Sequence, residues 1–544
     1  MTTAEADLVL TNASVLTMDP ARPTATSVAV REGVVMAVGG DDDTAGLVGP
    51  RTRVLNAGGR FAMPGFHDSH NHLMTTGLGM LRPGLHEARD IADVQAVVAR
   101  AAAEAEPGDW LETGPGWHET QLAEQRFPTT AELDAVAPAQ PVVIRRGGHN
   151  MVLNSEALRR AKITADAANP PGGTFVRDAN GNLTGHLVGK PALAPVLAVI
   201  PPVTDDQWAK AVVTASEAYA AAGITAVIDP GVSVEQMAVY RALAAAGELT
   251  IRTSMMWLPP VAGKDVASAL EVLRSGGFAP ETLSPWCRTL GVKLIADGGV
   301  ETGYYRDPYA HPDDPDHPRG KPLLAPDVLE AVCVSAAARG WHLGVHVLGD
   351  AATDMVLTAF RAAASGRGVR PLPRWTLIHL LNPRPEHWPT IRELGLSVTA
   401  QPGLFWQLAG GFVRYLGSER ARNIGPLAEL VRRLPGQVGG GSDSPVAPFA
   451  PLAGIATAAT RDTRDAGRLG PRWAVEVATM LGLYTTGSAW CAGQEQVAGR
   501  LTPGMFGDFV VLSSDPRAVP AAEVGGIEVL TTVAGGRVVH DRLG

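Results

Sequence analysis

Cysteine is scarce in this chain: Cys287, Cys333 and Cys491 are the only three among 544 residues. They are widely separated and set among apolar neighbours, so we expect three small buried side chains and no disulfide framework. The sequence also lacks an apolar run long enough to span a bilayer, and its first residues lack the basic and apolar regions of a signal peptide. We therefore expect a cytoplasmic protein.

An excess of basic residues is missing as well. The chain has 46 Lys and Arg against 55 Asp and Glu, a formal charge of −9, and the charges are spread without long blocks. This balance argues against nucleic acid as a partner. We expect a small-molecule substrate and no membrane partner, and we leave a homodimer open as the oligomeric state.

What the chain does contain is a repeated alternation of strand-like and helix-like segments. Ala- and Leu-rich stretches with helical spacing, such as 205–222, 233–246, 326–339 and 350–364, separate most of the short apolar runs. This alternation predicts βαβ units and a parallel sheet, and eight such runs predict a (β/α)8 TIM-like barrel whose strand C-termini converge on one functional face. The eight expected strands are 61–68, 224–229, 250–257, 289–296, 342–347, 375–379, 396–401 and 437–442.

At 544 residues the chain exceeds what one barrel needs, so further domains are expected. Short strand-like runs at both ends predict a composite β-sandwich from residues 1–62 and 498–544, beside a barrel over 63–497. Residues 73–203 are too many for one structureless connection and predict an inserted subdomain after the first barrel strand, placed to cover the active-site face. The terminal runs are 8–19, 27–39, 51–60, 507–513 and 527–539.

The segment Met63-Pro-Gly-Phe-His-Asp-Ser-His-Asn-His72 ends a strand-like run with a His-x-His pair. Residues i and i+2 of a strand point to the same face, so His70 and His72 form half of a metal site. Such a pair is often accidental, but further candidate ligands follow at or near the ends of later strands: Lys293, His346, His379 and Asp443. Imidazoles with a carboxylate suit Zn²⁺, and leave Fe, Mn and Co open.

Two of these candidates have a simpler reading. A protonated Lys293 has no lone pair and would repel a cation, so it fits the cluster only if it is neutralised or modified; the alternative is a partly buried lysine paired with Asp297 or another acid. Asp443 lies in a Gly-Ser-Asp turn, where the alternative is a carboxylate that caps local backbone amides.

Taken together, the motifs resemble the metal-dependent amidohydrolase superfamily, and most closely the amidohydrolase 3 branch with its N-substituted formamide deformylase-like enzymes. The order His-x-His, Lys, His, His, Asp is shared, as are Asn154-Ser-Glu-Ala-Leu158, Gln401-Pro402 and Gly-Ser-Asp-x-Pro-Val. Two departures leave the substrate open. Ile378 stands before His379 where the branch usually has Glu, and Gly147 precedes Gly148-His149 where an acidic residue is usual.

The resemblance implies a catalytic arrangement. One ion would be held by His70, His72 and Asp443, a second by His346 and His379, and Lys293, carboxylated by CO2, would bridge them. Bound metal lowers the pKa of water and polarises a carbonyl. Asp443 would act as general base and then as general acid.

The expected reaction is hydrolysis of a C–N bond in a small amide, N-formyl or N-acyl compound. Alternatives in the superfamily are deamination of a cyclic amidine and hydrolysis of a carbamate or lactam. An alternative of another class is a catalytically silent small-molecule binder.

Four further residues are expected to bind substrate. They are His149, Gln401, Trp406 and Tyr304. For His149 the alternative is a histidine satisfied within the insert, and for the aromatic residues it is loop packing. The loop 304–320, rich in Pro, Asp and His, is either a mobile lid or a solvated loop.

Overall fold

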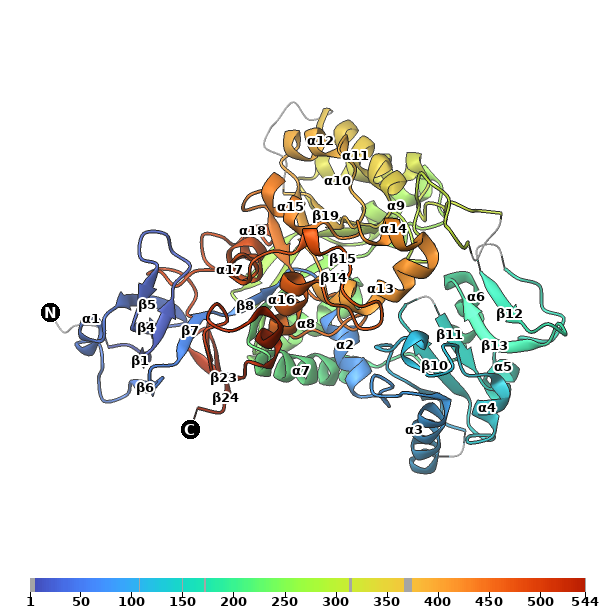
Figure 1. Ribbon diagram of the computed structural model, residues 1–544, viewed down its shortest axis with the longest axis horizontal. Helices are drawn as coiled ribbons and strands as arrows, with labels where there is room; N and C mark the ends of the chain where they lie inside the picture. Colours follow the sequence, from blue (N-terminus) through green and yellow to red (C-terminus); the bar gives the residue numbers. More distant parts are fainter. Residues whose placement is uncertain are drawn as a thin grey trace. The chain divides into compact units, whose positions relative to one another are not determined.

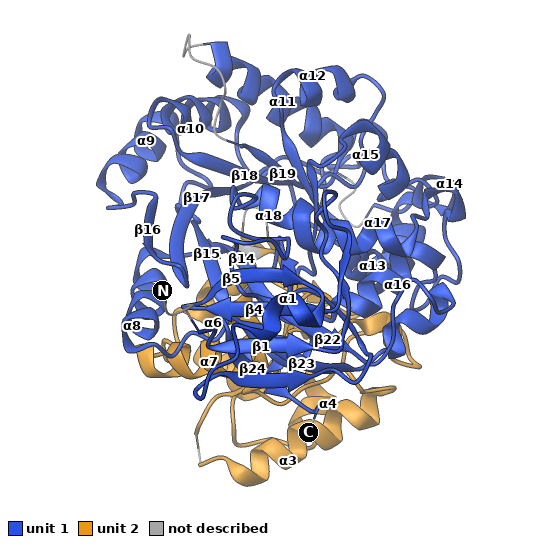
Figure 2. Cartoon of the chain, turned by 90° about the vertical axis from the view of Figure 1, so that its left-hand side faces the viewer, with its two compact units in different colours: residues 1–72, 216–443, 449–544 blue, residues 73–215, 444–448 orange. Residues whose placement is uncertain are grey.

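The computed structural model describes residues 5–106, 108–148, 150–170, 173–312, 316–365 and 374–543. Its chain forms two compact units (Figure 2). The first contains Met1–His72, Ser216–Asp443 and Phe449–Gly544, and the second contains Leu73–Ala215 and Ser444–Pro448. In the described ranges, no helix is both long and apolar enough to cross a membrane.

The first unit is built on a nearly closed barrel of eight parallel strands (Figure 1). The hydrogen-bonded order runs from β21 to β8, and the Ser69 N–H donates to the Gly440 carbonyl oxygen at 2.9 Å across the remaining seam. This confirms the expected fold class. The strands are β8 (Phe66–Asp68), β14 (Ile224–Val232), β15 (Arg252–Trp257), β17 (Cys287–Ile295), β18 (His342–Val347), β19 (Thr376–His379), β20 (Ser397–Ala400) and β21 (Val438–Gly440). An antiparallel strand, β16 (Glu281–Ser284), pairs with β17.

One expected strand, 61–68, is two strands in the structure. β7 (Phe61–Pro64) pairs with β22 in a side sheet, whereas β8 pairs with β14 in the barrel. The chain changes sheets at Gly65, where a Cβ would lie 2.3 Å from the Thr225 side chain. A continuous apolar run does not reveal such a change, because both sheets bury it.

Helices connect the barrel strands, as predicted. The four expected helices appear as α7 (Asp205–Ala221), α8 (Val234–Ala246), α10 (Pro326–Ala338) and α11 (Asp350–Ser365). α8 has both of its termini encoded locally: Ser233 and Gln236 form a capping box, and Gly247 ends the helix with a φ of +74°. α7 begins in the second unit and ends in the first. The other α-helices of the first unit are α1 (Asp41–Ala45), α9 (Val266–Ser275), α12 (His387–Glu393), α13 (Pro402–Leu416), α14 (Ser418–Ala421), α15 (Leu427–Arg433), α16 (Pro451–Thr460), α17 (Val477–Gly482) and α18 (Ser488–Cys491).

Segments from both chain ends form two packed sheets beside the barrel. One sheet has the order β5-β4-β1-β6 and the other β24-β23-β22-β7-β2-β3. Apolar side chains from both, including Leu10, Val30, Phe509 and Val533, share one core. The strands are β1 (Leu8–Thr11), β2 (Ser14–Leu16), β3 (Thr24–Ala25), β4 (Ser27–Arg31), β5 (Val34–Gly39), β6 (Arg53–Asn56), β22 (Phe509–Leu512), β23 (Val529–Ala534) and β24 (Arg537–Asp541).

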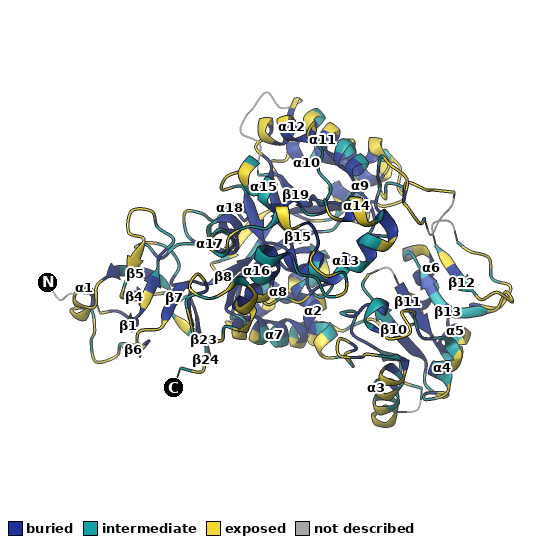
Figure 3. Cartoon of the chain, in the orientation of Figure 1, coloured by how far each residue is buried: buried dark blue, intermediate teal, exposed yellow. Residues whose placement is uncertain are grey.

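The second unit is a five-stranded sheet with helices, in the order β12-β13-β11-β10-β9. Alternate residues of its central strands enter two separate apolar clusters, with Ile144 in one and Val143 in the other, so both faces of the sheet are covered. Figure 3 shows β10 and β11 largely buried. Its elements are α2 (Leu73–Met80), α3 (Ile91–Glu104), β9 (Leu111–Glu112), α4 (Thr130–Asp134), β10 (Val142–Arg146), β11 (Asn150–Leu153), α5 (Ser155–Arg160), β12 (Thr174–Arg177), β13 (Leu183–Val188) and α6 (Lys190–Leu197).

The three cysteines are free and buried, as expected.

Candidate metal centre

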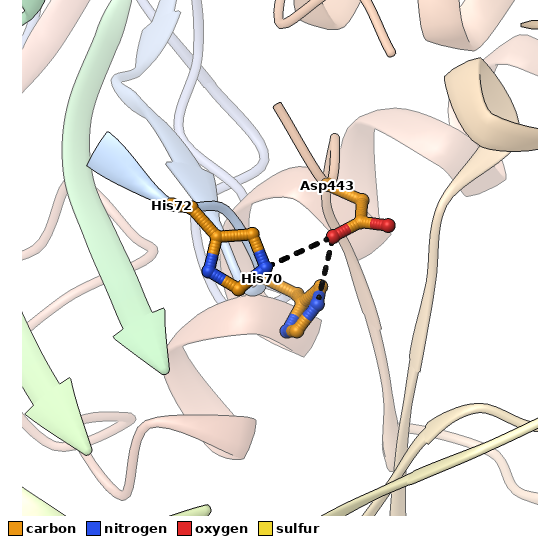
Figure 4. A group of neighbouring side chains, drawn as sticks. All are labelled: His70, His72 and Asp443. Carbon is orange, nitrogen blue, oxygen red and sulfur yellow. Dashed lines mark ion pairs between the residues drawn. The ribbon is translucent and has the colours of Figure 1, made fainter. Parts of the chain in front are cut away.

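His70, His72 and Asp443 meet just beyond the C-terminal ends of β8 and β21, the two strands at the barrel seam (Figure 4). Nε2 of His70 lies 3.1 Å from Oδ1 of Asp443, and Nε2 of His72 lies 3.3 Å from the same oxygen. The side chain of His70 is 1% exposed and that of His72 is 30% exposed. The trio therefore forms a cluster of metal-ligand type that is buried on one side and accessible on the other.

Asp68 holds the two segments of this cluster together. Its Oδ1 accepts hydrogen bonds from the backbone N–H groups of His70, at 3.1 Å, and Ser442, at 3.0 Å, and its Oδ2 accepts one from the Ser442 hydroxyl at 2.6 Å. Burial raises the pKa of the Asp68 carboxyl to about 7. Sequence reasoning missed this role; the available signal was a carboxylate two residues before the first ligand.

Asp443 adopts a strained backbone, with a φ of +61°. Its N–H donates to the His70 carbonyl oxygen at 2.7 Å, and its carboxylate faces the two imidazoles rather than the amides of its own turn. Burial opposes ionisation, but hydrogen bonds from His70 and His72 and the nearby His379 hold the pKa of Asp443 well below its usual value. The geometry thus disfavours the turn-cap alternative.

His346 and His379 lie next to this trio. The ring centroid of His379 lies 5.0 Å from that of His70 and 4.8 Å from that of His346. Nε2 of His346 is 3.1 Å from the Gly298 carbonyl oxygen, to which it donates as an N–H, so Nδ1 keeps the lone pair. Nδ1 of His379 is 2.7 Å from Oε1 of Gln401.

Lys293 completes the group from β17. Its side chain is buried and interacts electrostatically with His70, His346 and Asp443, and burial lowers its pKa to about 7. The alternative partner, Asp297, accepts instead from three backbone N–H groups: Tyr304 at 3.0 Å, Leu348 at 3.0 Å and Gly349 at 2.9 Å. The carboxylate that interacts electrostatically with Lys293 is that of Asp443.

The donor set fits a divalent cation. Burial, followed by the charge of Lys293, lowers the pKa values of His70 and His346 to about 3, so both are neutral near pH 7 and carry lone pairs. Burial also holds the pKa of His379 well below its usual value. Nδ1 of His70 is buried and makes no hydrogen bond within the described part of the chain. Neutral imidazoles beside an ionised carboxylate are the ligands that Zn²⁺ prefers.

The expected substrate-binding residues are not all brought to this cluster. Gln401 does reach the cluster, because its side chain forms a hydrogen bond with His379. Tyr304 lies near it by its backbone, which donates to Asp297, while its side chain is half-buried. Trp406 is half-buried on α13, and among the described residues its side chain makes no hydrogen bond or ring contact with the cluster. His149 lies outside the described residues.

The described part of loop 304–320 is anchored. The Arg306 N–H donates to Asp350 at 2.8 Å, and its guanidinium pairs with Asp354 at 2.6 Å. Tyr305 and Tyr309 are buried in an apolar cluster with Phe412. These contacts make the two tyrosines packing residues, while residues 307, 308, 310, 311 and 316–319 of the loop are exposed.

Comparison with known proteins agrees with this geometry. A model of the amidohydrolase family matches residues 53–540. The N-substituted formamide deformylase of Arthrobacter pascens is 27% identical over 99% of both chains, and the protein LONG AFTER FAR-RED 3 of Arabidopsis thaliana is 28% identical over 98% of this chain and 92% of its own. A crystal structure of an uncharacterized metal-dependent hydrolase from Pyrococcus horikoshii shares the fold, with a TM-score of 0.74 at 22% identity, covering 94% of this chain and 99% of that one.

The family match spans most of the chain. His70, His72 and Asp443, which could together hold a metal ion, lie next to one another at the barrel seam. The chain belongs to the amidohydrolase family and is a metal-dependent hydrolase of that superfamily.

Proposed function

We propose that this protein hydrolyses the C–N bond of a small amide, N-formyl or N-acyl compound. The observation that carries the proposal is the His-His-Asp cluster at the barrel seam, with His346, His379 and Lys293 beside it. Full-length similarity to an N-substituted formamide deformylase supports this bond class. This similarity indicates the bond class and not the substrate, because the residues that line a pocket change faster in evolution than a barrel and its metal ligands.

We further propose that the metal is zinc, with His70, His72 and Asp443 as one ligand set and His346 and His379 as another. Lys293 would join the two sets as a carbamate. Its depressed pKa supports this, because a neutral amine is the form that reacts with CO2. A divalent ion held there would polarise the substrate carbonyl and make water acidic enough to attack at neutral pH.

The chain's own part in the reaction falls to Asp443. Its Oδ1 faces His70 and His72, whereas Oδ2 points away from both rings (Figure 4). We assign to Oδ2 the proton of the attacking water, which then passes to the leaving nitrogen as the C–N bond breaks. One water is consumed, and a carboxylate and an amine are released. The low pKa of Asp443 keeps it in the required ionised form before attack.

Metal analysis and product analysis test this proposal. Purified protein should carry up to two divalent ions per chain and lose turnover on chelation, and His70→Ala should lose metal and turnover together. His86→Ala, at an exposed histidine outside the cluster, is the matched control and should lose neither.

A screen of N-formyl and N-acyl amines should then yield a carboxylate and an amine. Release of ammonia from a cyclic amidine would assign deamination instead, and opening of a lactam or carbamate would assign that reaction. Full activity in metal-free protein would rule out the mechanism.

A further inference from the structure

We infer that Gln401 is a positioning residue: it fixes the ring and the tautomer of His379 so that Nε2 of this histidine presents its lone pair to a divalent ion. This inference rests on the proposed function for its metal. It concerns a side chain that is not itself a metal ligand and that we first expected to bind substrate.

The contact is short and specific. Oε1 of Gln401 lies 2.7 Å from Nδ1 of His379, and both side chains are buried. An amide oxygen only accepts, so Nδ1 must carry the hydrogen. A neutral imidazole has one N–H, which leaves Nε2 as the unprotonated nitrogen.

The backbone of His379 explains why its ring needs such support. His379 has a φ of +74° and Leu380 has a φ of +43°, a conformation that non-glycine residues rarely adopt. Because the chain turns sharply there, packing along a regular strand does not orient the ring. A hydrogen bond to Gln401, the residue directly after the neighbouring strand β20, supplies that orientation.

The other contacts of Gln401 do not compete with this role. It is the N-cap residue of α13, but its side chain makes no capping hydrogen bond. Its Nε2 is buried without a partner among the described residues. The amide therefore keeps an orientation in which its oxygen faces Nδ1 of His379 while its own N–H donors stay unpaired among the described residues.

Two substitutions separate positioning from packing. Gln401→Met keeps the length of the side chain but removes the acceptor. Gln401→Glu keeps an acceptor for the Nδ1–H of His379. Gln407→Met, at a buried glutamine on the same helix, is the matched control.

The readouts are Zn²⁺ affinity, by competition with a chromophoric chelator, and the visible spectrum of the Co²⁺-loaded protein. Gln401→Met should weaken affinity by roughly 10- to 100-fold and change the Co²⁺ spectrum, as expected when an outer partner of a ligating histidine is removed. Gln401→Glu should restore most of the affinity, and Gln407→Met should match the wild type.

Wild-type affinity in Gln401→Met, or a Gln401→Glu protein as weak as Gln401→Met, would overturn the inference. A melting curve on each preparation detects a variant that has not folded, and Gln401→Glu then carries the comparison with the wild type. A wild-type protein that binds no Zn²⁺ at all would refute the proposed function itself. A failed screen for substrate with normal Zn²⁺ binding refutes only the proposed C–N substrates and leaves this result standing.

Discussion

At the scale of single residues, the two oxygens of Asp443 have different surroundings. Oδ1 is shared between His70 and His72, and Oδ2 is turned away from them. If Oδ1 binds metal and Oδ2 takes a proton, as proposed, activity should depend on the charge of this side chain more than on its size.

Asp443→Asn separates these roles. Asn keeps the size, tolerates the φ of +61° and still offers an oxygen, but it has no basic carboxylate, so kcat should fall by roughly 10²–10⁴-fold while folding persists. Melting temperature, metal content and kcat should be measured on the same preparation. Normal kcat with intact metal would place the proton shuttle elsewhere, and His149 would be the next candidate.

At the scale of elements, a buried ion pair joins β10 to the short helix Glu119–Gln121 in the second unit. Arg146 donates to Glu119 through Nε at 2.9 Å and through Nη2 at 2.8 Å. Burial disfavours the charged carboxylate, but the guanidinium outweighs this and lowers the pKa of Glu119 to about 2.

This pair predicts a pH-dependent stability. Because the pKa of Glu119 is lower in the folded chain than in the unfolded one, its contribution is complete above pH 4.5 and is lost as pH falls toward 2. The shift corresponds to about 3 kcal/mol at neutral pH.

Urea unfolding of wild type and Glu119→Gln from pH 7 to pH 3 should give a difference that shrinks with acidity. A difference that stays constant with pH would show that the loss comes from packing. Glu156→Gln, at a carboxylate paired near the surface with Arg159, is the control and should cost little.

At the scale of the whole first unit, one salt bridge links the barrel to the terminal sheets. Arg252 of β15 pairs with Asp508, just before β22, at 2.7 Å, and its guanidinium lies 3.6 Å from the ring centroid of Phe506. Asp508 also accepts from the Gly535 N–H at 2.6 Å. This ion pair thus connects two parts of the chain that are 256 residues apart in the sequence.

Arg252→Met should destabilise this unit by roughly 3–5 kcal/mol, because it leaves the Asp508 carboxylate buried without its partner. Adding Asp508→Asn should recover part of the loss. Thermal unfolding of the wild type, of Arg252→Met, of Asp508→Asn and of the double variant measures this coupling. If the two losses simply add, the pair is not coupled and the loss reflects aromatic packing alone.

Much of the fold was predictable because its signals are local. Each candidate ligand lies in a short barrel strand or just after one, so the alternation of strands and helices was enough to predict that His70, His346 and Asp443 meet at one end of a barrel. Three features were not predictable. They are the change of sheet at Gly65, the hydrogen bond between Gln401 and His379, and the hydrogen bonds by which Asp68 joins His70 to Ser442. Each depends on a partner that only the folded chain supplies.

The barrel seam has a consequence for biosynthesis. Ser69 and Gly440 are 371 positions apart, and Asp68 and Ser442 are 374 apart, so the first ligands emerge from the ribosome long before the aspartate that completes their set. A nascent chain at five to twenty residues per second spends some 20–75 seconds between the two events. If the His-His-Asp set holds a metal ion as proposed, the complete set becomes available only near the end of synthesis, because a chain that ends before residue 443 contains the two histidines without the aspartate.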